Sequence, residues 1–214
     1  DLETELMIPI ADPEADIPGN RFNDGKCDPA GRLWAGTMAF DGMQNHEQGA
    51  LYCLDSDGSV TQKLGRVSVS NGIVWSSDAR TMYFIDTVKN DLRAFDYNLD
   101  SGSISNERVT VRNDGDGHFD GMTIDAEGMV WIAIFGGSAV RRYNPETGEH
   151  LSTVELPVEQ ITSCAFGGAD LDQLYITSGA FQLSAEDLSK QPLAGSLFRT
   201  APGVCGIPAN EFEG

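Results

Sequence analysis

Hydrophobic residues along this chain gather in short runs, and polar turn residues separate one run from the next. The stretch 120–133 is typical of the pattern. It contains a polar first residue (Asp120), a short apolar-rich run (122–124), turn residues (125–128) and a second apolar run (129–133). Short runs of β-branched and aromatic residues around an Asp/Gly turn predict two strands joined as a β-hairpin.

The same hairpin pattern occurs four times. Each copy ends in a large aromatic residue, and these residues are Trp34, Tyr83, Trp131 and Tyr175, separated by 49, 48 and 44 residues. A repeat of this length with about four short strands is typical of a β-propeller blade. A β-sandwich also has short strands and frequent turns, but it has no reason to repeat one hairpin at near-constant spacing. The pattern therefore predicts an all-β propeller.

The repeat also divides the chain into units, which start near residues 21, 70, 120 and 163. Residues 1–19 do not match it. We expect 1–214 to belong to a single propeller domain. One helical turn is predicted within 183–193, with Ser184 as its N-cap ahead of acidic residues.

Polar residues open the first strand of each unit, about eleven positions before the aromatic residue. They are Asn23-Asp24-Gly25, Ser70-Asn71-Gly72, Asp120-Gly121 and Ser163-Cys164. In a propeller these innermost strands line a central channel, so we expect the polar residues to converge. Three of the four positions offer an amide or carboxylate oxygen followed by Gly, which allows a sharp bend and a close approach to a ligand.

Oxygen ligands from Asn and Asp suit a hard divalent cation such as Ca²⁺ or Mg²⁺. Taken singly, each Asn/Asp-Gly pair is better explained as a turn. Their recurrence at one phase of the repeat favours a cation site in the channel.

Charge and composition narrow the class of partner. The formal net charge is −19, from 33 acidic and 14 basic residues, which disfavours binding to nucleic acid and to anionic membranes. The four cysteines form no C-x-x-C pair, which argues against a zinc ribbon or a thioredoxin-like redox site. No signal peptide is visible and the longest apolar run, 129–135, is too short to span a bilayer. We therefore expect a cytoplasmic protein.

The run Arg21-Phe22-Asn23-Asp24-Gly25-Lys26, followed by Asp28-Pro29-Ala30-Gly31-Arg32, resembles the regucalcin/gluconolactonase (senescence marker protein) family. Later blades carry similar stretches at 70–76, 120–131 and 162–168, so the resemblance extends from about Arg21 to Gly206. It implies a six-bladed propeller with one divalent cation in the channel. Members of this family hydrolyse sugar lactones, and relatives act on other lactones or on organophosphates.

The resemblance also implies roles for individual residues. Asn71 and Asp120 match metal ligands, and Asp120 also matches the proposed general base. Arg21 and Asn23 match residues that hold the substrate, and Asp41 falls roughly where some members carry a substrate-contacting glutamate. The third metal ligand of the family, a glutamate in an E-G-P-x-W-like motif, has no counterpart here. Four repeats do not close a six-bladed ring, so we expect the N-terminal blades to be missing from this chain.

These features together predict a metal-dependent hydrolase of sugar lactones. A divalent cation (Ca²⁺, Zn²⁺, Mn²⁺ or Mg²⁺) would polarise the lactone carbonyl, with Asp120 as general base. Two alternatives remain open. One is a non-catalytic propeller that binds Ca²⁺ or a partner protein, and the other is a hydrolase of phosphotriesters with the same cation.

Overall fold

The described part of the chain in this computed structural model, residues 7, 9–42, 44 and 46–214, folds into four antiparallel sheets. The first sheet contains β1 (Asn20–Cys27), β2 (Leu33–Ala39), β3 (Gly49–Leu54) and β4 (Val60–Val67). The second contains β5 (Ser70–Trp75), β6 (Thr81–Asp86), β7 (Asp91–Asn98) and β8 (Ser103–Arg112). The third contains β9 (His118–Ile124), β10 (Val130–Phe135), β11 (Ala139–Tyr143) and β12 (His150–Glu155). The fourth contains β13 (Ile161–Gly167), β14 (Gln173–Ser178) and β15 (Leu197–Thr200), with helix α1 (Ala185–Lys190) between its last two strands.

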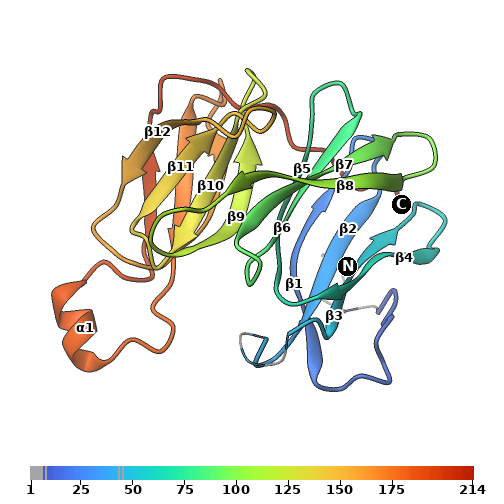
Figure 1. Ribbon diagram of the computed structural model, residues 1–214, viewed down its shortest axis with the longest axis horizontal. Helices are drawn as coiled ribbons and strands as arrows, with labels where there is room; N and C mark the ends of the chain where they lie inside the picture. The colour runs from blue at the N-terminus through green and yellow to red at the C-terminus, as the bar shows by residue number, and fades with distance from the viewer. Residues whose placement is uncertain (1–6, 8, 43, 45) are drawn as a thin grey trace.

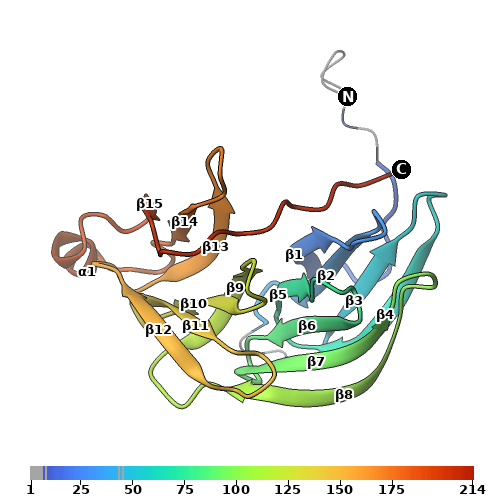
Figure 2. The same cartoon turned by 90° about the horizontal axis from the view of Figure 1, so that it is seen from above.

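The strands of each sheet pair in sequence order (Figure 1). The sheets stand side by side in an arc, with the first strand of each sheet (β1, β5, β9 and β13) on the inner side (Figure 2). This arrangement confirms the all-β fold and a propeller with four blades. The four inner strands begin within two residues of the starts that the sequence repeat predicts.

The C-terminal segment runs from the fourth sheet across the open side of the arc to the first sheet (Figure 2). Along the way, the N–H of Ala126 donates to the carbonyl of Cys205 at 2.9 Å. At the far end, the N–H of Glu213 donates to the carbonyl of Gly31 at 3.0 Å. These bonds connect the end of the chain to the turns of the first and third sheets.

Apolar side chains fill the spaces between neighbouring sheets. Both faces of β5 and β10 are buried, and β10 is accordingly a continuous hydrophobic run. Large buried groups between the first and second sheets include Trp34, Trp75, Phe84, Phe95 and Tyr97. Those between the second and third sheets include Tyr83, Ile85, Phe119, Ile132 and Tyr143, and those toward the fourth sheet include Trp131, Ile161 and Leu174. Packing on both sides holds each inner strand in a defined position.

A buried aspartate lies six residues before the tryptophan in two of the four hairpins. The carboxylate of Asp28 accepts hydrogen bonds from Arg32 Nε at 2.7 Å, Trp34 Nε1 at 2.8 Å and the Tyr97 hydroxyl at 2.6 Å. Burial alone would raise the pKa of Asp28, but the hydrogen bonds from Tyr97, Arg32 and Trp34 lower it below its ordinary value. The aspartate therefore ties its turn to the aromatic residue that ends the hairpin motif.

The third sheet repeats this device. Asp125 accepts from Trp131 Nε1 at 2.9 Å and from Arg142 Nε at 2.8 Å. Both pairs have the same spacing, Asp28 with Trp34 and Asp125 with Trp131. The recurring Asp and Trp of the sequence are thus one structural unit, and their conserved spacing within the chain reflects folding of the blade.

Helix α1 begins where the sequence predicts. Ser184 is its N-cap: its hydroxyl accepts from the N–H of Asp187 at 3.1 Å, and the Asp187 carboxylate accepts from the N–H of Ser184 at 3.2 Å. These two bonds form a capping box. Within the described part of the chain, no helix combines the length and the apolar character needed to cross a membrane.

We expect Asp28→Ala to lower the free energy of unfolding by about 3–5 kcal/mol, because it leaves the buried Arg32 guanidinium without its counter-charge. Urea denaturation followed by tryptophan fluorescence would measure the change. Asp170→Ala is the control: Asp170 is exposed, so its removal should change stability by less than about 0.5 kcal/mol. Equal effects of the two substitutions would contradict a stabilising role for the Asp28 network.

Candidate functional site

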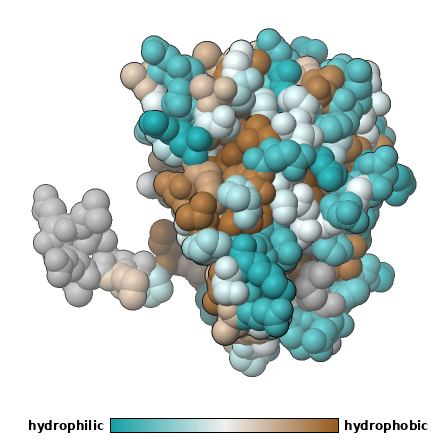
Figure 3. Space-filling model, turned by 90° about the vertical axis from the view of Figure 1, so that its left-hand side faces the viewer, coloured by the Kyte–Doolittle hydropathy of each residue, from teal (hydrophilic) through white to brown (hydrophobic). Residues whose placement is uncertain are grey.

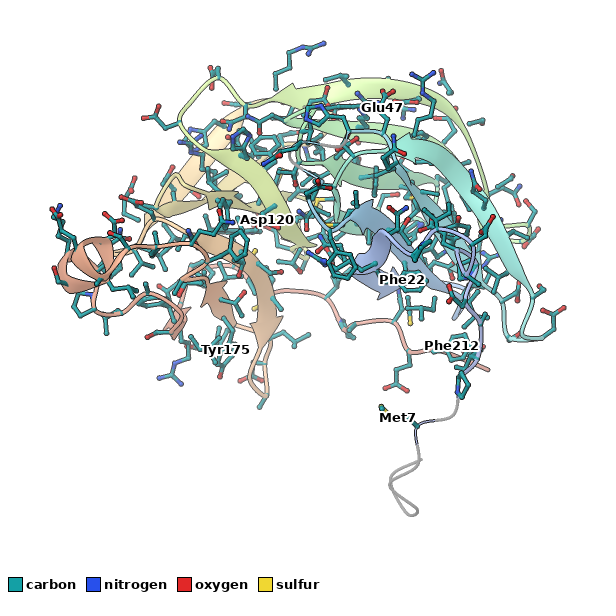
Figure 4. The ribbon with its side chains drawn as sticks, turned by 90° about the horizontal axis from the view of Figure 1, so that it is seen from below. Met7, Phe22, Glu47, Asp120, Tyr175 and Phe212 are labelled. Carbon is teal, nitrogen blue, oxygen red and sulfur yellow. The ribbon has the colours of Figure 1, made fainter. Side chains whose placement is uncertain are left out.

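The inner strands border a cavity of about 820 Å³. Asp120, at the start of β9, lies on the inner side of the arc beside this space (Figure 4). The polar residues that line the cavity are Arg21, Asn23, Asp24, Asn71, Thr87, His118, Asp120, Gln160, Gln182, Thr162 and Ser163. The apolar ones are Met38, Val69, Phe135, Phe181 and Leu183, and Gly121 completes the lining. The cavity therefore combines side chains from all four blades.

Each inner strand is irregular at the position where it reaches the cavity. The pairing register shifts between Phe22 and Gly25 in β1, between Asn71 and Ile73 in β5 and between Ile161 and Ser163 in β13. In β9 the shift lies at 120–121, opposite the segment of β10 between Ile132 and Ile134. An extra residue in one strand bends it and redirects its side chains. The four irregularities thus turn the polar residues toward a common space.

Glycine at these positions allows neighbouring inner strands to approach closely. A Cβ on Gly72 would lie 2.9 Å from the Asp120 carbonyl oxygen, and a Cβ on Gly121 would lie 2.8 Å from the Thr162 carbonyl oxygen. Neither glycine has a positive φ. These glycines are therefore needed because the backbone of the next blade occupies the space that a side chain would take. Their expected role in a bend next to a ligand stays a prediction.

A chain of hydrogen bonds links the first three blades behind the cavity. The amide of Asn23 donates to the Ser70 carbonyl at 2.7 Å and to Asn71 Oδ1 at 3.2 Å. The amide of Asn71 donates to Thr87 Oγ1 at 2.7 Å, and Thr87 donates onward to the Phe119 carbonyl at 2.9 Å. These hydrogen bonds fix the amide group of Asn71. Its Oδ1 accepts the 3.2 Å bond from Asn23.

Two carboxylates, Asp24 and Asp120, lie near one another at the cavity. Burial, together with the negative charge of Asp24, raises the pKa of Asp120 to about 7, and the Gly121 N–H offsets only part of this rise. Burial also raises the pKa of Asp24, against the effects of the Gly25 N–H and of Lys26. A site that crowds acidic groups out of water favours a proton or a cation at their oxygens.

Lys26 adds a positive charge close to Asp24. Its ammonium donates to the Met122 carbonyl of β9 at 3.1 Å, which spans the first and third blades. Burial lowers the pKa of Lys26, while the neighbouring Asp24 and Cys164 act to raise it. The positive charge of Lys26 acts to lower the pKa of Asp24. The pKa of Asp120 is instead raised by burial and by Asp24.

The structure brings together four of the five residues that the family resemblance selects. Arg21, Asn23, Asn71 and Asp120 all line the cavity. Arg21 Nη1 donates to the Phe22 carbonyl and to Asn23 Oδ1, both at 3.0 Å, so it lies beside the Asn23 amide. Asp41 is exposed in the turn that follows β2 and is not among the described residues that line the cavity.

Asp24, Thr87, His118 and Gln160 also line the cavity, although the sequence predicts no specific role for them. Asp24 has a detectable signal, since it belongs to one of the four polar strand starts, and His118 lies two residues before Asp120. Thr87 and Gln160 have none, because they lie in connections between strands. Among the described residues, no group of three or more His, Cys, Asp or Glu side chains is arranged to hold a metal ion. Any metal here would therefore need Asn71 or other oxygen ligands.

Comparisons with known proteins place the chain among a defined set of relatives. A family described as the SMP-30/Gluconolactonase/LRE-like region matches residues 1–180. Regucalcin from Danio rerio is 48% identical over 199 residues, which cover 92% of this chain and 68% of that protein.

The chain is also similar to solved structures. A luciferin-regenerating enzyme is 38% identical with a TM-score of 0.89, covering 95% of this chain and 69% of that one. A regucalcin from Agrobacterium tumefaciens, described as a calcium-binding protein, is 34% identical with a TM-score of 0.93. That match covers 99% of this chain and 71% of the other.

The raised pKa of Asp120 predicts a pH-dependent effect on stability. Between about pH 4 and pH 7 the folded state holds this proton more tightly than the unfolded state, so Asp120 makes folding less favourable as the pH rises. With EDTA present, Asp120→Asn should therefore be more stable than wild type at pH 8 and equally stable at pH 4. Each unit of pKa difference contributes at most about 1.4 kcal/mol.

Urea denaturation at both pH values would measure this difference, with the exposed Asp172→Asn as control. A difference between Asp120→Asn and wild type that stays the same from pH 4 to pH 8 would contradict the prediction.

Proposed function

Because the chain belongs to the SMP-30/gluconolactonase/LRE-like family, we propose that it is a metal-dependent lactonase that acts on sugar lactones. The observation that carries this proposal is the meeting of Asn23, Asn71 and Asp120 in one cavity from three separate blades. A purely structural propeller has no need of this convergence of hydrogen-bonding and acidic groups. The proposed substrate is a small molecule, with no role for nucleic acid or membranes.

The residues present fit a hard divalent cation. Asp120 is desolvated beside a second carboxylate and has no cationic side chain among the groups that shift its pKa. Asn71 Oδ1 is fixed in place by the bond from the Asn71 amide to Thr87 and accepts one bond of 3.2 Å. Carboxylate and amide oxygens are ligands that Ca²⁺, Mg²⁺ and Mn²⁺ prefer, and Zn²⁺ also accepts carboxylate. We assign Asn71 and Asp120 as the ligands that this chain contributes.

Asp120 would also act as the general base. When bound, the cation would supply Lewis-acid polarisation of the lactone carbonyl. Asp120 would orient a water molecule toward the carbonyl carbon and accept its proton as the new bond forms. Opening of the ring then releases the hydroxy acid, with the proton returned to the departing ring oxygen. Coordination by the cation would keep Asp120 ionised at neutral pH, as a general base requires.

Arg21 and Asn23 would hold the substrate. The guanidinium of Arg21 keeps further donors after its two bonds to the Phe22 carbonyl and to Asn23 Oδ1. Both residues line the cavity, so they could bind the ring oxygens or hydroxyls of a sugar lactone and fix its orientation. Asp41 stays a proposed substrate contact on the family resemblance, from the turn after β2.

We further propose that the four blades are part of a six-bladed ring formed as a single domain. The arc of sheets leaves one side unoccupied by strands (Figure 2). The Danio rerio relative is longer, because this chain spans 68% of it. A closed ring would surround the cavity on all sides.

A second candidate function is calcium binding without catalysis. It is favoured by the Agrobacterium tumefaciens structure, which is described as a calcium-binding protein and matches nearly the whole chain. The acidic cavity suits both functions, since the same oxygens bind the cation in each. Turnover decides between them.

We expect the purified protein to hydrolyse gluconolactone, to lose activity in EDTA and to regain it with Ca²⁺, Zn²⁺ or Mn²⁺.

Asp120→Asn should lower kcat by about 10²–10⁴-fold, because it removes the general base. The exposed Asp172→Asn is the matched control. Near-normal activity of Asp120→Asn would refute the assigned role. Ca²⁺ binding by calorimetry without turnover would favour the calcium-binding alternative, and turnover of paraoxon alone would favour a phosphotriesterase.

Substitution of Arg21 should separate binding from chemistry. Arg21→Ala is expected to raise the KM for gluconolactone about tenfold or more while changing kcat less, because the lost interaction exists in both the ground state and the transition state. Steady-state kinetics would measure both constants. Arg112→Ala, which removes an exposed arginine remote from the cavity lining, should leave them unchanged.

A further inference from the structure

The cavity lining includes both polar and apolar side chains. The polar residues Arg21, Asn23, Asn71 and Asp120 come from the first three inner strands, and the fourth blade adds Gln160, Gln182, Thr162 and Ser163. The segment after β14 contributes the apolar residues Phe181 and Leu183, and Phe135 lies at the end of β10. A lactone bound at Asp120 would therefore share the cavity with both hydrogen-bonding groups and an exposed phenyl ring.

Phe181 is 67% exposed although it borders this cavity. It belongs to the connection between β14 and α1. The face of the molecule in Figure 3 carries hydrophobic residues (brown) near its middle. Leu197, on the neighbouring β15, is similarly exposed at 64% but does not line the cavity. An exposed phenyl ring at the edge of a cavity gains favourable free energy when an apolar ligand covers it.

The position of Phe181 is set by a buried glutamine. Gln160 is only 8% exposed. Its amide Nε2 donates to the Phe181 carbonyl and its Oε1 accepts from the Phe181 N–H, both at 2.8 Å. The backbone carbonyl of Gln160 also accepts from the Gly179 N–H at 2.8 Å. Both backbone polar groups of Phe181 are thus satisfied by one side chain.

Gln160 anchors the first part of the segment 179–183. It bonds to Gly179 and Phe181, and it pairs with Phe135 in an isolated β-bridge at the cavity. Ser184 follows as the N-cap of α1, and its capping bonds are made to Asp187 within the helix. The anchored part presents Phe181 in a defined geometry. Such preorganisation favours selective binding, because the ligand does not have to order this part of the loop.

We propose that Phe181 and Leu183 are specificity-determining residues that bind an apolar substituent on the lactone, so that the site accepts alkyl- or aryl-substituted lactones in addition to sugar lactones. Gln160 is the positioning residue of this subsite. The proposal rests on the lactonase function proposed above. The lactone ring lies near Asp120, and its hydrocarbon chain extends along Phe181, which offers a sugar hydroxyl no free hydrogen-bonding group.

The test compares gluconolactone with an alkyl-substituted δ-lactone, δ-decalactone, in the metal-loaded protein. Phe181→Ala should lower kcat/KM for δ-decalactone about tenfold or more and leave gluconolactone within about twofold, because it removes apolar contact alone. Leu197→Ala, a change at a similarly exposed residue outside the cavity, should leave both values unchanged. An equal effect of Phe181→Ala on the two lactones, or no effect on either, would overturn the proposal.

Gln160→Leu tests the positioning role. It removes both bonds to the Phe181 backbone at similar side-chain volume, so it should raise the KM for δ-decalactone more than that for gluconolactone. Urea denaturation confirms in parallel that the variant is folded. A uniform fall in kcat for both lactones would contradict a positioning role.

A binding measurement separates this proposal from the lactonase function. The δ-lactam with the same alkyl chain resists hydrolysis, and its Kd can be measured by calorimetry with or without catalysis. If wild type turns over neither lactone, the proposed function fails. If Phe181→Ala binds the lactam at least about tenfold more weakly than wild type does, the apolar subsite is still supported. An equal Kd for the two proteins would overturn it.

Discussion

The close approach of the four inner strands is the constraint on which the rest of this structure depends. Gly72 and Gly121 show how tight it is, since a Cβ at either position would collide with the backbone of the adjacent blade. Strands this close must be supported from outside, and large aromatic groups such as Trp34 and Trp131 fill the wedges between the sheets. The buried Asp28 and Asp125 carboxylates fasten these rings to their turns.

The same crowding creates the chemistry of the cavity. Each inner strand carries an irregular pairing where it meets its neighbours, and at these points the polar side chains turn into the enclosed space. Asp24 and Asp120 are brought together with little water around them, which raises the pKa of both. Much of the cost of burying these carboxylates is removed by a proton or a cation. The fold therefore places unfavourable electrostatics at one position, where a ligand relieves it.

The fourth blade contributes two kinds of element to the cavity. Its polar strand start contributes Thr162 and Ser163, while the segment after β14 contributes Phe181, Gln182 and Leu183. Gln160 holds this segment through both backbone groups of Phe181. The cavity is thus lined partly by bulged strands and partly by a connection that one buried amide anchors.

The sequence alone determined the all-β propeller, its four blades and the phase at which Asn23, Asn71 and Asp120 recur, because a repeat of short strands encodes local structure and its period. It also identified Ser184 as the helix N-cap, a signal that is local. Strand alternation would place Asn23 and Asp24 on opposite faces, so only the bulge in β1 explains why both line the cavity. The positions of three further residues relative to the cavity depend on the paths of connecting segments; these residues are Asp41, Gln160 and Phe181. Tertiary packing alone decided those paths, since they follow from contacts between residues far apart in the chain.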